Sequence, residues 1–324
     1  MTEETQSLGP VLTVVTAAFN EAKNLGLLYD RLRASLDGLK ITWNWIVVDD
    51  HSADGTFGVI SALAAADPRV RGLRLAHNSG SHTALTCGIR FASGRCAVVL
   101  AADLQDPPEA IAALLAKWRT GSQVVWAVRA HRPGETARTL AFARFYYWIM
   151  RRVVGLRQMP ATGADFFLMD RRVIDAFRHF GEANASMLAL ITWMGFRQDR
   201  IEYTKEPRLH GKSGWSLQKK LKLVVDSVTS FTYAPIRLIS LAGFLVAMVG
   251  FVYAGFIAFH AMTGHPVEGW SSMMIVLLVL GGFQMIFMGI LGEYLWRALD
   301  EARRRPQFLI EDSTGTEGVD LGGS

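Results

Sequence analysis

The chain has 324 residues, of which 50% are hydrophobic, and a formal net charge of +5 at pH 7. A mean hydropathy of +0.21 is high for a purely soluble protein, and the length suits one substantial domain with an appendage or two modest domains. The two cysteines, Cys87 and Cys96, give no metal-ligand spacing, which excludes a disulfide-rich scaffold and a cysteine-based zinc site.

Short apolar blocks alternate with helical stretches over the first 130 residues. The predicted strands are Val11–Val15, Trp43–Val48, Val70–Leu75, Ala97–Ala101 and Val124–Val128. The predicted helices are Glu21–Leu39, Thr56–Ala66, His82–Ala92 and Pro108–Thr120. Continuous apolar strands separated by helices indicate an α/β fold, with a mainly parallel sheet covered by helices on both faces.

Two later stretches are amphipathic but are too short or too polar to cross a bilayer. Phe142–Leu156 is rich in aromatic residues and contains Arg151 and Arg152, and residues 216–235 carry apolar side chains at the spacing of one helical face. Helices of this kind often lie in the membrane interface. We expect interfacial helices here, and packing on the soluble core is the alternative for each.

Two uncharged runs follow, Leu238–Phe259 and Met273–Gly292. A helix needs about 20 apolar residues to cross a bilayer, so both runs are long enough. Arg237 precedes the first run and four arginines follow the second, whereas the connector His260–Ser272 has no Lys or Arg. The positive-inside rule then predicts a transmembrane hairpin with both ends cytoplasmic; two buried helices of a soluble protein are the alternative.

The expected division follows from these elements. A cytoplasmic α/β domain covers residues 1–215, an interfacial helix 216–235, the hairpin 236–296 and a cytoplasmic tail 297–324, disordered from Ser313. Residues Met1–Pro10 have no basic residue and no apolar core of a signal peptide, so a multi-pass protein of the inner membrane is expected. The basic clusters border the apolar runs, which favours anionic headgroups or a lipid phosphate as partners over nucleic acid.

Three polar strings come directly after predicted strands, where open α/β sheets bind ligands. They are Phe19–Leu25 (FNEAKNL), Val48–Thr56 (VDDHSADGT) and Ala101–Glu109 (AADLQDPPE). Carboxylates at such places can bond ribose hydroxyls, read a base edge or hold a hard cation. Each string alone is also compatible with an ordinary turn or helix cap, and it is their order on this strand pattern that is specific.

Together the strings resemble the glycosyltransferase family 2 nucleotide-sugar domain of GT-A fold, and in particular the polyprenyl-phosphate glycosyltransferases, which include dolichol-phosphate mannose synthase. The resemblance runs from about Val11 to Phe308. Its most specific string is Asp103–Glu109, and later matching strings are Asn78–Gly88, Asp165–Arg171, Arg208–Ser213, Pro235–Leu238 and Gly292–Leu295 with Arg305-Pro306.

The resemblance implies transfer of a sugar from a nucleotide-sugar to a polyprenyl phosphate, with inversion at the anomeric carbon, and a divalent cation (Mg²⁺ or Mn²⁺). It implies that Asp103 and Gln105 hold the cation and that Glu21 and Asp50 contact the nucleoside. Asp165 is then expected near the sugar. The remaining residues expected at the donor are Phe19, Ala102, Arg129 and Arg138, and Arg208 and Lys212 are further candidates for binding phosphate. Surface solvation is the alternative for the basic residues, and capping of a local turn for Asp165.

Three positions depart from the family pattern. Ala101 replaces the first acid of the Asp-x-Asp metal motif, Phe167 replaces an arginine and Gly214 replaces a lysine. These changes keep open a catalytically weak or silent protein that binds nucleotide-sugars. A processive polysaccharide synthase would need more spans and a Gln-x-x-Arg-Trp motif, which is absent, and a purely structural membrane-anchored partner would not need the Asp103–Glu109 string.

Self-association through the hairpin is a further possibility, and packing only within one hairpin is the alternative to it. Small residues let helices approach closely. The glycines concerned are Gly281, Gly282, Gly289 and Gly292.

Overall fold

A computed structural model describes residues 9–130, 146–152, 154–156, 158–160, 165–182, 186–206, 229, 231–232, 234–263 and 269–315. The chain divides into two compact units. One comprises Met1–Val224 with Pro306–Ser324, and the other comprises Val225–Arg305. The first unit thus contains the segment that follows the second apolar helix of the chain.

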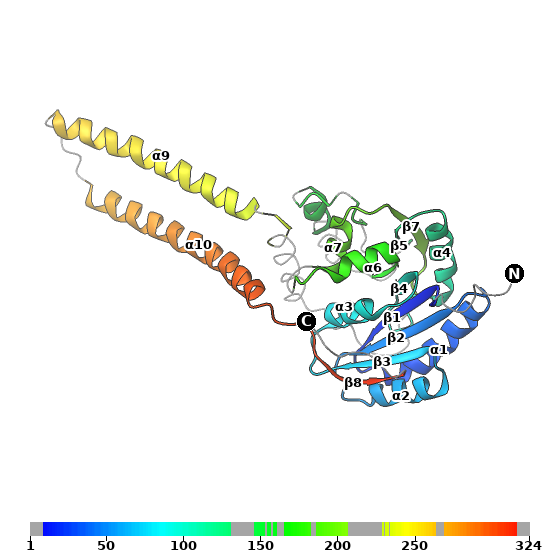
Figure 1. Ribbon diagram of the computed structural model, residues 1–324. Coiled ribbons are helices and arrows are strands. Elements are labelled where there is room, and N and C mark those ends of the chain that lie inside the picture. Colours follow the sequence, from blue (N-terminus) through cyan, green and yellow to red (C-terminus); the bar gives the residue numbers. More distant parts are fainter. Residues whose placement is uncertain are drawn as a thin grey trace. The chain divides into compact units, whose positions relative to one another are not determined.

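An eight-stranded sheet forms the centre of the first unit (Figure 1). Its strands are β1 Leu12–Ala18, β2 Trp43–Asp49, β3 Val70–Leu75, β4 Cys96–Val99, β5 Val124–Arg129, β6 Phe166–Asp170, β7 Gln198–Tyr203 and β8 Ile310–Thr314. The order is β7-β5-β6-β4-β1-β2-β3-β8. The run β3-β2-β1-β4 and the pair β5-β7 are parallel, whereas β6 and β8 are antiparallel to their neighbours.

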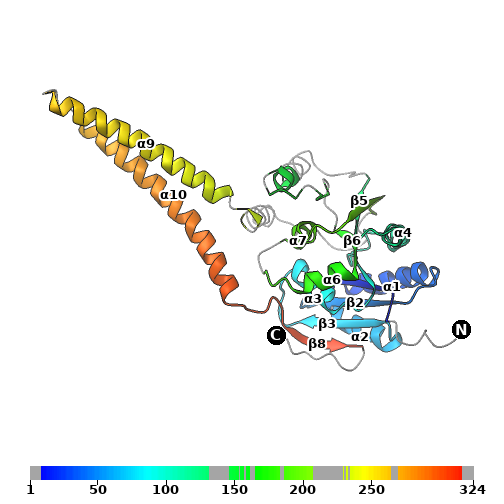
Figure 2. The ribbon, with the colours of Figure 1, turned by 45° about the horizontal axis from the view of Figure 1, so that its top comes forward.

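Helices cover both faces of this sheet (Figure 2). They are α1 Ala22–Asp37, α2 Thr56–Ala66, α3 Ser81–Phe91, α4 Ile111–Arg119 after a short 3₁₀ turn at Pro108–Ala110, α6 Arg171–Arg178 and α7 Met187–Trp193. Successive residues of a strand point to opposite faces. Accordingly Trp45 and Val47 of β2 pack in the core that α1, α2 and α4 complete, and Ile46 and Val48 pack against α3.

Helix α1 shows why the sequence forms these elements. Its Leu25, Leu28, Leu32 and Leu36 recur at the three- and four-residue spacing of one helical face, and all four are fully buried. The loop before β3 is fixed by Asp67, whose carboxylate accepts bonds from Arg69 and from the Tyr29 hydroxyl. The Arg69 guanidinium holds the pKa of Asp67 well below its usual range.

The predicted α/β class is confirmed, and the five predicted strands and four predicted helices lie within a few residues of observed ones. One prediction was wrong: Ser313 and Thr314 are not disordered but end the edge strand β8. The strand pairs with β3 at Gly72, where a Cβ would lie 2.7 Å from the Thr314 side chain, so only glycine leaves room for it. Strands β6 and β7 were not predicted.

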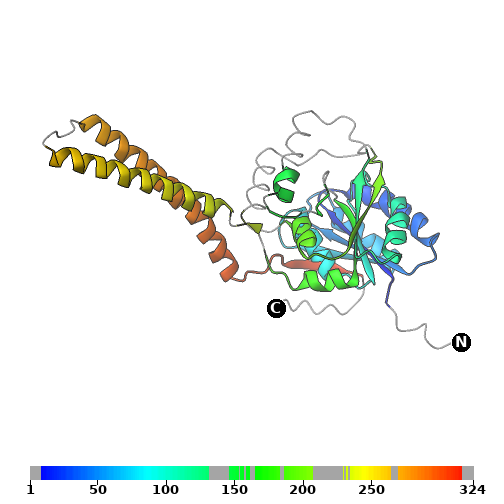
Figure 3. The same ribbon diagram turned by 90° about the horizontal axis from the view of Figure 1, so that it is seen from above.

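The second unit contains two long helices, α9 Ala234–Met262 and α10 Trp270–Ala302, which lie side by side (Figure 3). Each has a window long and apolar enough to cross a membrane, Ile236–Ile257 and Val279–Ala302. The first window matches the predicted span, and the second is displaced toward the C-terminus. Residues 146–152 of the first predicted amphipathic stretch are helical, and most of residues 216–235 lie outside the described residues.

Candidate active site

The loops that follow β1 and β2 are joined by hydrogen bonds. The backbone N–H of Asn20 donates to the Ser52 hydroxyl at 2.9 Å, and the Asn20 side chain accepts from the backbone N–H of Ala53 at 3.0 Å. The backbone N–H of Glu21 donates to Thr56 Oγ1 at 3.0 Å. Two of the three sequence strings are therefore one structural unit at the carboxyl ends of neighbouring parallel strands.

Left-handed backbone marks each of the three loops. Among the described residues, five non-glycine residues have positive φ, and Asn20, His51 and Leu104 are three of them, with φ of 57°, 60° and 60°. A bulky residue such as Leu104 is rare in this region, which costs about 1–2 kcal/mol per residue. Such strain tends to occur at functional sites because the surrounding contacts are arranged to hold it.

Asp50 connects the second loop to the turn before α3. Its two carboxylate oxygens accept from the backbone N–H groups of Ser79 at 2.7 Å and Gly80 at 2.9 Å. Burial raises the pKa of Asp50 and the neighbouring Asp49 adds to this, while the two backbone donors oppose it. Nearby, Phe19 exposes 47% of its surface, so an aromatic face and a buried carboxylate line the same edge of the sheet.

The third loop is attached to the chain that leaves β7. Asp103, only 7% exposed, accepts from the backbone N–H of Gln105 at 3.2 Å. The Gln105 amide nitrogen donates to the carbonyl oxygen of Glu206 at 3.3 Å, and the Glu206 N–H donates to the Gln105 carbonyl at 2.8 Å. Arg31 of α1 pairs with Glu206 at 2.9 Å and with Glu109 at 2.8 Å, which fixes the loop from its outer side.

A buried polar network lies beneath this loop. The Tyr203 hydroxyl donates to Asp106 at 2.5 Å, and Lys205 Nζ lies 3.6 Å from the same carboxylate. Burial raises the pKa of Asp106, and Lys205 opposes this shift. Arg129 shares a hydrogen bond with Tyr203 and pairs with Asp165 at 3.2 Å. Burial is the largest single influence on Arg129 and works against its charge, but Asp165, Tyr203 and Asp106 together outweigh it, so the pKa of Arg129 is raised.

Comparison with known proteins decides the family. The model of glycosyl transferase family 2 matches residues 13–178, which contain all three loops. The chain belongs to glycosyltransferase family 2. Its α/β unit is accordingly the GT-A nucleotide-sugar domain that the resemblance implied, and the chain is a glycosyltransferase.

Two relatives resemble the chain over nearly its whole length. The uncharacterised glycosyltransferase YkcC of Bacillus subtilis (strain 168) is 35% identical over 310 residues, which cover 95% of this chain and 96% of the relative. The SfII prophage-derived bactoprenol glucosyl transferase of Shigella flexneri is 31% identical over 303 residues, which cover 93% and 98%. Among solved structures, mannosyl-3-phosphoglycerate synthase of Rubrobacter xylanophilus aligns over 72% of this chain and 75% of its own, with 15% identity and a TM-score of 0.48.

The structure brings together part of the site expected for this glycosyltransferase. Asp103 and Gln105 share one loop, and Arg129 pairs with Asp165 beside it. Ala102 is buried in the loop after β4, and Glu21 accepts a bond from the Asn24 amide at the start of α1. The predicted Arg138, Arg208 and Lys212 lie outside the described residues.

Sequence reasoning did not find the Asp106, Tyr203 and Lys205 network or the role of Arg31. Asp106 belongs to a string that the sequence singled out, but nothing in that string distinguishes its buried side chain from that of Asp103. Tyr203 and Lys205 carry no sequence signal at all, because they reach the loop only through the pairing of β7 with β5.

A divalent cation fits the residues present, with few protein ligands. Among the described residues no three His, Cys, Asp or Glu side chains form a metal-binding group. The Asp103 carboxylate and the Gln105 amide oxygen are the hard oxygen donors that Mg²⁺ and Mn²⁺ accept, and Mg²⁺ often uses one or two carboxylates with substrate phosphates and water. Ala101 offers no oxygen ligand from its side chain.

Proposed function

We propose that this glycosyltransferase moves a sugar from a nucleotide-sugar to a polyprenyl phosphate at the cytoplasmic face of the membrane. The observation that supports it most is the end-to-end similarity to a bactoprenol glucosyl transferase, which includes the helical hairpin as well as the GT-A domain. The two membrane-length helices agree with a lipid acceptor. A soluble acceptor would not require them.

The proposed reaction does not need a strong general base. A lipid phosphate is ionised at neutral pH, so one of its oxygens can attack the anomeric carbon directly while the bond to the nucleoside diphosphate breaks. One in-line displacement inverts the anomeric centre. The protein must position the two reactants and stabilise the negative charge that develops on the departing diphosphate.

The described residues suggest which side chains position the reactants and which stabilise the departing diphosphate. Phe19, Glu21 and Asp50 would hold the nucleoside, and the buried Ala102 would lie beneath the donor. Arg129 and Asp165 would orient the sugar. Asp103 and Gln105 would hold the cation, which supplies charge stabilisation on the diphosphate. For the basic residues outside the described ranges, Arg138, Arg208 and Lys212, the family resemblance supports phosphate binding.

The arginine distribution supports a hairpin whose two ends are cytoplasmic, in an inner-membrane protein whose GT-A domain faces the cytoplasm. The hydropathy pattern supports the division into domains 1–215, 216–235, 236–296 and 297–324, with residues 306–324 belonging to the same compact unit as the first domain. Within the second unit, a Cβ built on any of Gly281, Gly282, Gly289 and Gly292 meets nothing within 4 Å, which is compatible with a homo-oligomer. Mass measurement of the protein in detergent tests that association.

The decisive experiment uses the full-length protein in detergent. It is incubated with undecaprenyl phosphate and a panel of UDP- and GDP-sugars, each with Mg²⁺, with Mn²⁺ or with a chelator, and the lipid fraction is analysed by mass spectrometry. We expect one donor to yield a glycosylated polyprenyl phosphate, with the anomer opposite to that of the donor by NMR. No product from any donor, in a protein that still binds nucleotide-sugar, would refute the proposal.

Ala101 favours a second candidate, a membrane protein that binds nucleotide-sugars without transferring them. This candidate predicts saturable donor binding by calorimetry together with no transfer and no donor hydrolysis. The same panel of donors separates the two candidates.

A further inference from the structure

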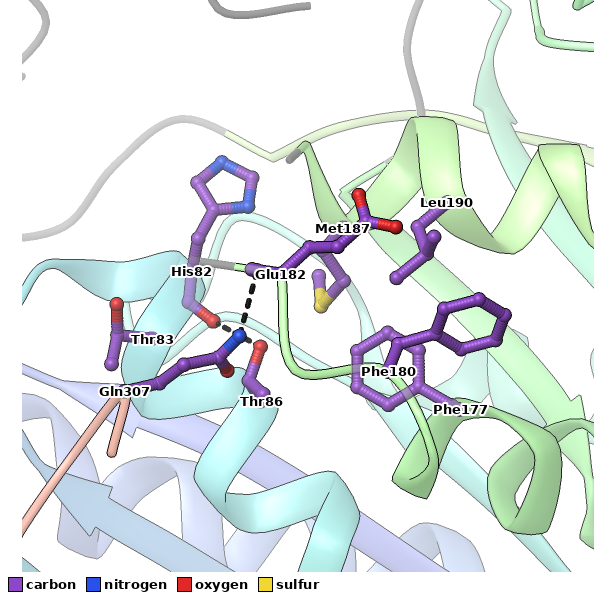
Figure 4. Close-up of a pocket in the computed structure, with 9 residues that line it drawn as sticks. All are labelled: His82, Thr83, Thr86, Phe177, Phe180, Glu182, Met187, Leu190 and Gln307. Atoms are coloured by element: carbon purple, nitrogen blue, oxygen red, sulfur yellow. Dashed lines mark hydrogen bonds between the residues drawn. The ribbon is translucent and has the colours of Figure 1, made fainter. Parts of the chain in front are cut away.

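A cavity of about 90 Å³ lies between α3, α6 and α7 (Figure 4). Its walls come from α3, from α6 and the chain just after it, from α7, and from the segment that follows α10. The lining residues are His82, Thr83, Thr86, Phe177, Phe180, Glu182, Met187, Leu190 and Gln307. None of them was assigned to the donor by the sequence.

The two sides of the cavity differ in character. Figure 4 shows His82, Thr83 and Thr86 on the α3 side and Phe177, Phe180, Met187 and Leu190 on the other, with the Glu182 carboxylate beside Leu190. Two polar groups are bonded within the wall: the Thr86 hydroxyl donates to the His82 carbonyl at 2.9 Å, and Gln307 donates to the Glu182 carbonyl at 2.7 Å. The four apolar side chains offer no hydrogen bonds, so a polar group packed directly against them would lose its bonds to water without replacement.

His82 connects the cavity to the expected sugar site. Its Nδ1 is enclosed and has no hydrogen-bond partner. Burial lowers the pKa of His82, so the ring is neutral at pH 7, and Asp165 is the charged group that opposes this shift. Asp165 is also the partner of Arg129. His82, a residue of the cavity wall, therefore lies within electrostatic range of the pair that is proposed to orient the sugar.

The apolar wall continues to the surface of the first unit. Trp193 at the end of α7 exposes 58% of its surface and packs edge-on against Phe180, with ring centroids 5.9 Å apart. On the other side, Gln307 follows Ala302, the last residue of α10, by only five residues in the chain. One lining residue of the cavity thus lies five residues along the chain from the end of a candidate membrane span.

We propose that this cavity holds the first isoprenoid unit of the polyprenyl phosphate acceptor, with His82 at the phosphate end and Phe180 and Trp193 along the chain's path to the surface. The inference rests on the proposed function. Size agrees with it: a cavity of about 150 Å³ accommodates benzene, so about 90 Å³ accommodates roughly four carbon atoms, close to one branched five-carbon unit. Aromatic and methionine side chains suit such an unsaturated, branched hydrocarbon.

The test is to fill the cavity in the full-length protein. Leu190→Trp places a larger side chain in the cavity, whereas Leu188→Trp, on the same helix but outside the lining, is the matched control. Transfer is measured with undecaprenyl phosphate and with two soluble acceptors of equal carbon number, geranyl phosphate and the unbranched decyl phosphate. Donor KM and melting temperature are measured alongside.

We expect Leu190→Trp to raise the acceptor KM about tenfold or more and to leave the donor KM unchanged. The wild type and Leu188→Trp should prefer geranyl over decyl phosphate, and Leu190→Trp should lose that preference, which a general loss of stability would not produce. If Leu190→Trp melts much lower, Met187→Phe fills the same space.

An acceptor KM and a preference within about twofold of wild type in both filled variants would overturn the inference. A wild-type protein that transfers nothing to undecaprenyl phosphate would instead refute the proposed function itself. The two failures are therefore distinguishable in one set of assays.

Discussion

Asp103→Ala is the sharpest test of how the diphosphate is stabilised. Asp103 is buried in the loop after β4, where its carboxylate accepts from the backbone N–H of Gln105. The rest of the loop is held without it, because Tyr203 donates to Asp106 and Arg31 pairs with Glu109. We therefore expect the fold and the loop to persist in the variant.

The magnitudes separate a structural from a catalytic role. Losing one hydrogen bond to a charged acceptor costs about 1.5–3 kcal/mol of stability at most, and less if water replaces the carboxylate. Losing the main group that neutralises the leaving diphosphate costs about 3 kcal/mol or more in the transition state. That corresponds to a decrease in kcat of roughly 150-fold.

The assay compares sugar transfer to undecaprenyl phosphate in the wild type, in Asp103→Ala and in Glu109→Gln. Glu109 lies in the same loop but is 57% exposed and faces Arg31, so its loss of charge should change kcat by no more than about fivefold. Ala101→Asp should lower the cation concentration needed for half-maximal transfer. Near-normal turnover of Asp103→Ala in the presence of a chelator would refute the cation mechanism and transfer the role to the basic residues.

Three further expectations concern stability, donor binding and topology. The ion pair with Arg69 lowers the pKa of Asp67. Its contribution to stability is therefore present above the pKa of the unfolded state, near 4, and is lost as the pH falls through the pKa of the folded state. Asp67→Asn should lower the melting temperature at pH 7 and have a progressively smaller effect below pH 4. Glu311 of β8 lies 3.4 Å from His51 in the loop after β2, so Glu311→Gln should weaken nucleotide-sugar binding about two- to fivefold by calorimetry, whereas Asp312→Asn on the same strand should not. A tag at Gly264 should be labelled only from outside the cell; labelling from the cytoplasm would overturn the proposed topology.

The sequence alone determined the elements whose signal is local. Strands such as Trp43–Asp49 are apolar over most of their length, because both faces of a central parallel strand are covered. The acidic strings stand at strand ends because the chain must turn there, and their residue order identified the family. The helices α9 and α10 were predicted from length and apolar composition, since a bilayer imposes its thickness on any chain that crosses it.

Only the tertiary structure decided the features that depend on distant pairing. Gln198–Tyr203 alternates in polarity too weakly to indicate a strand, and it becomes one because the edge of β5 is available to it. The tail strand β8 likewise forms because Gly72 leaves space beside β3. Asp103 and Asp106 are three residues apart in one string, yet Tyr203, almost a hundred residues further along the chain, bonds Asp106. No local pattern reveals such a partner, because the direction of a side chain in a turn is set by the contacts that the whole fold brings to it.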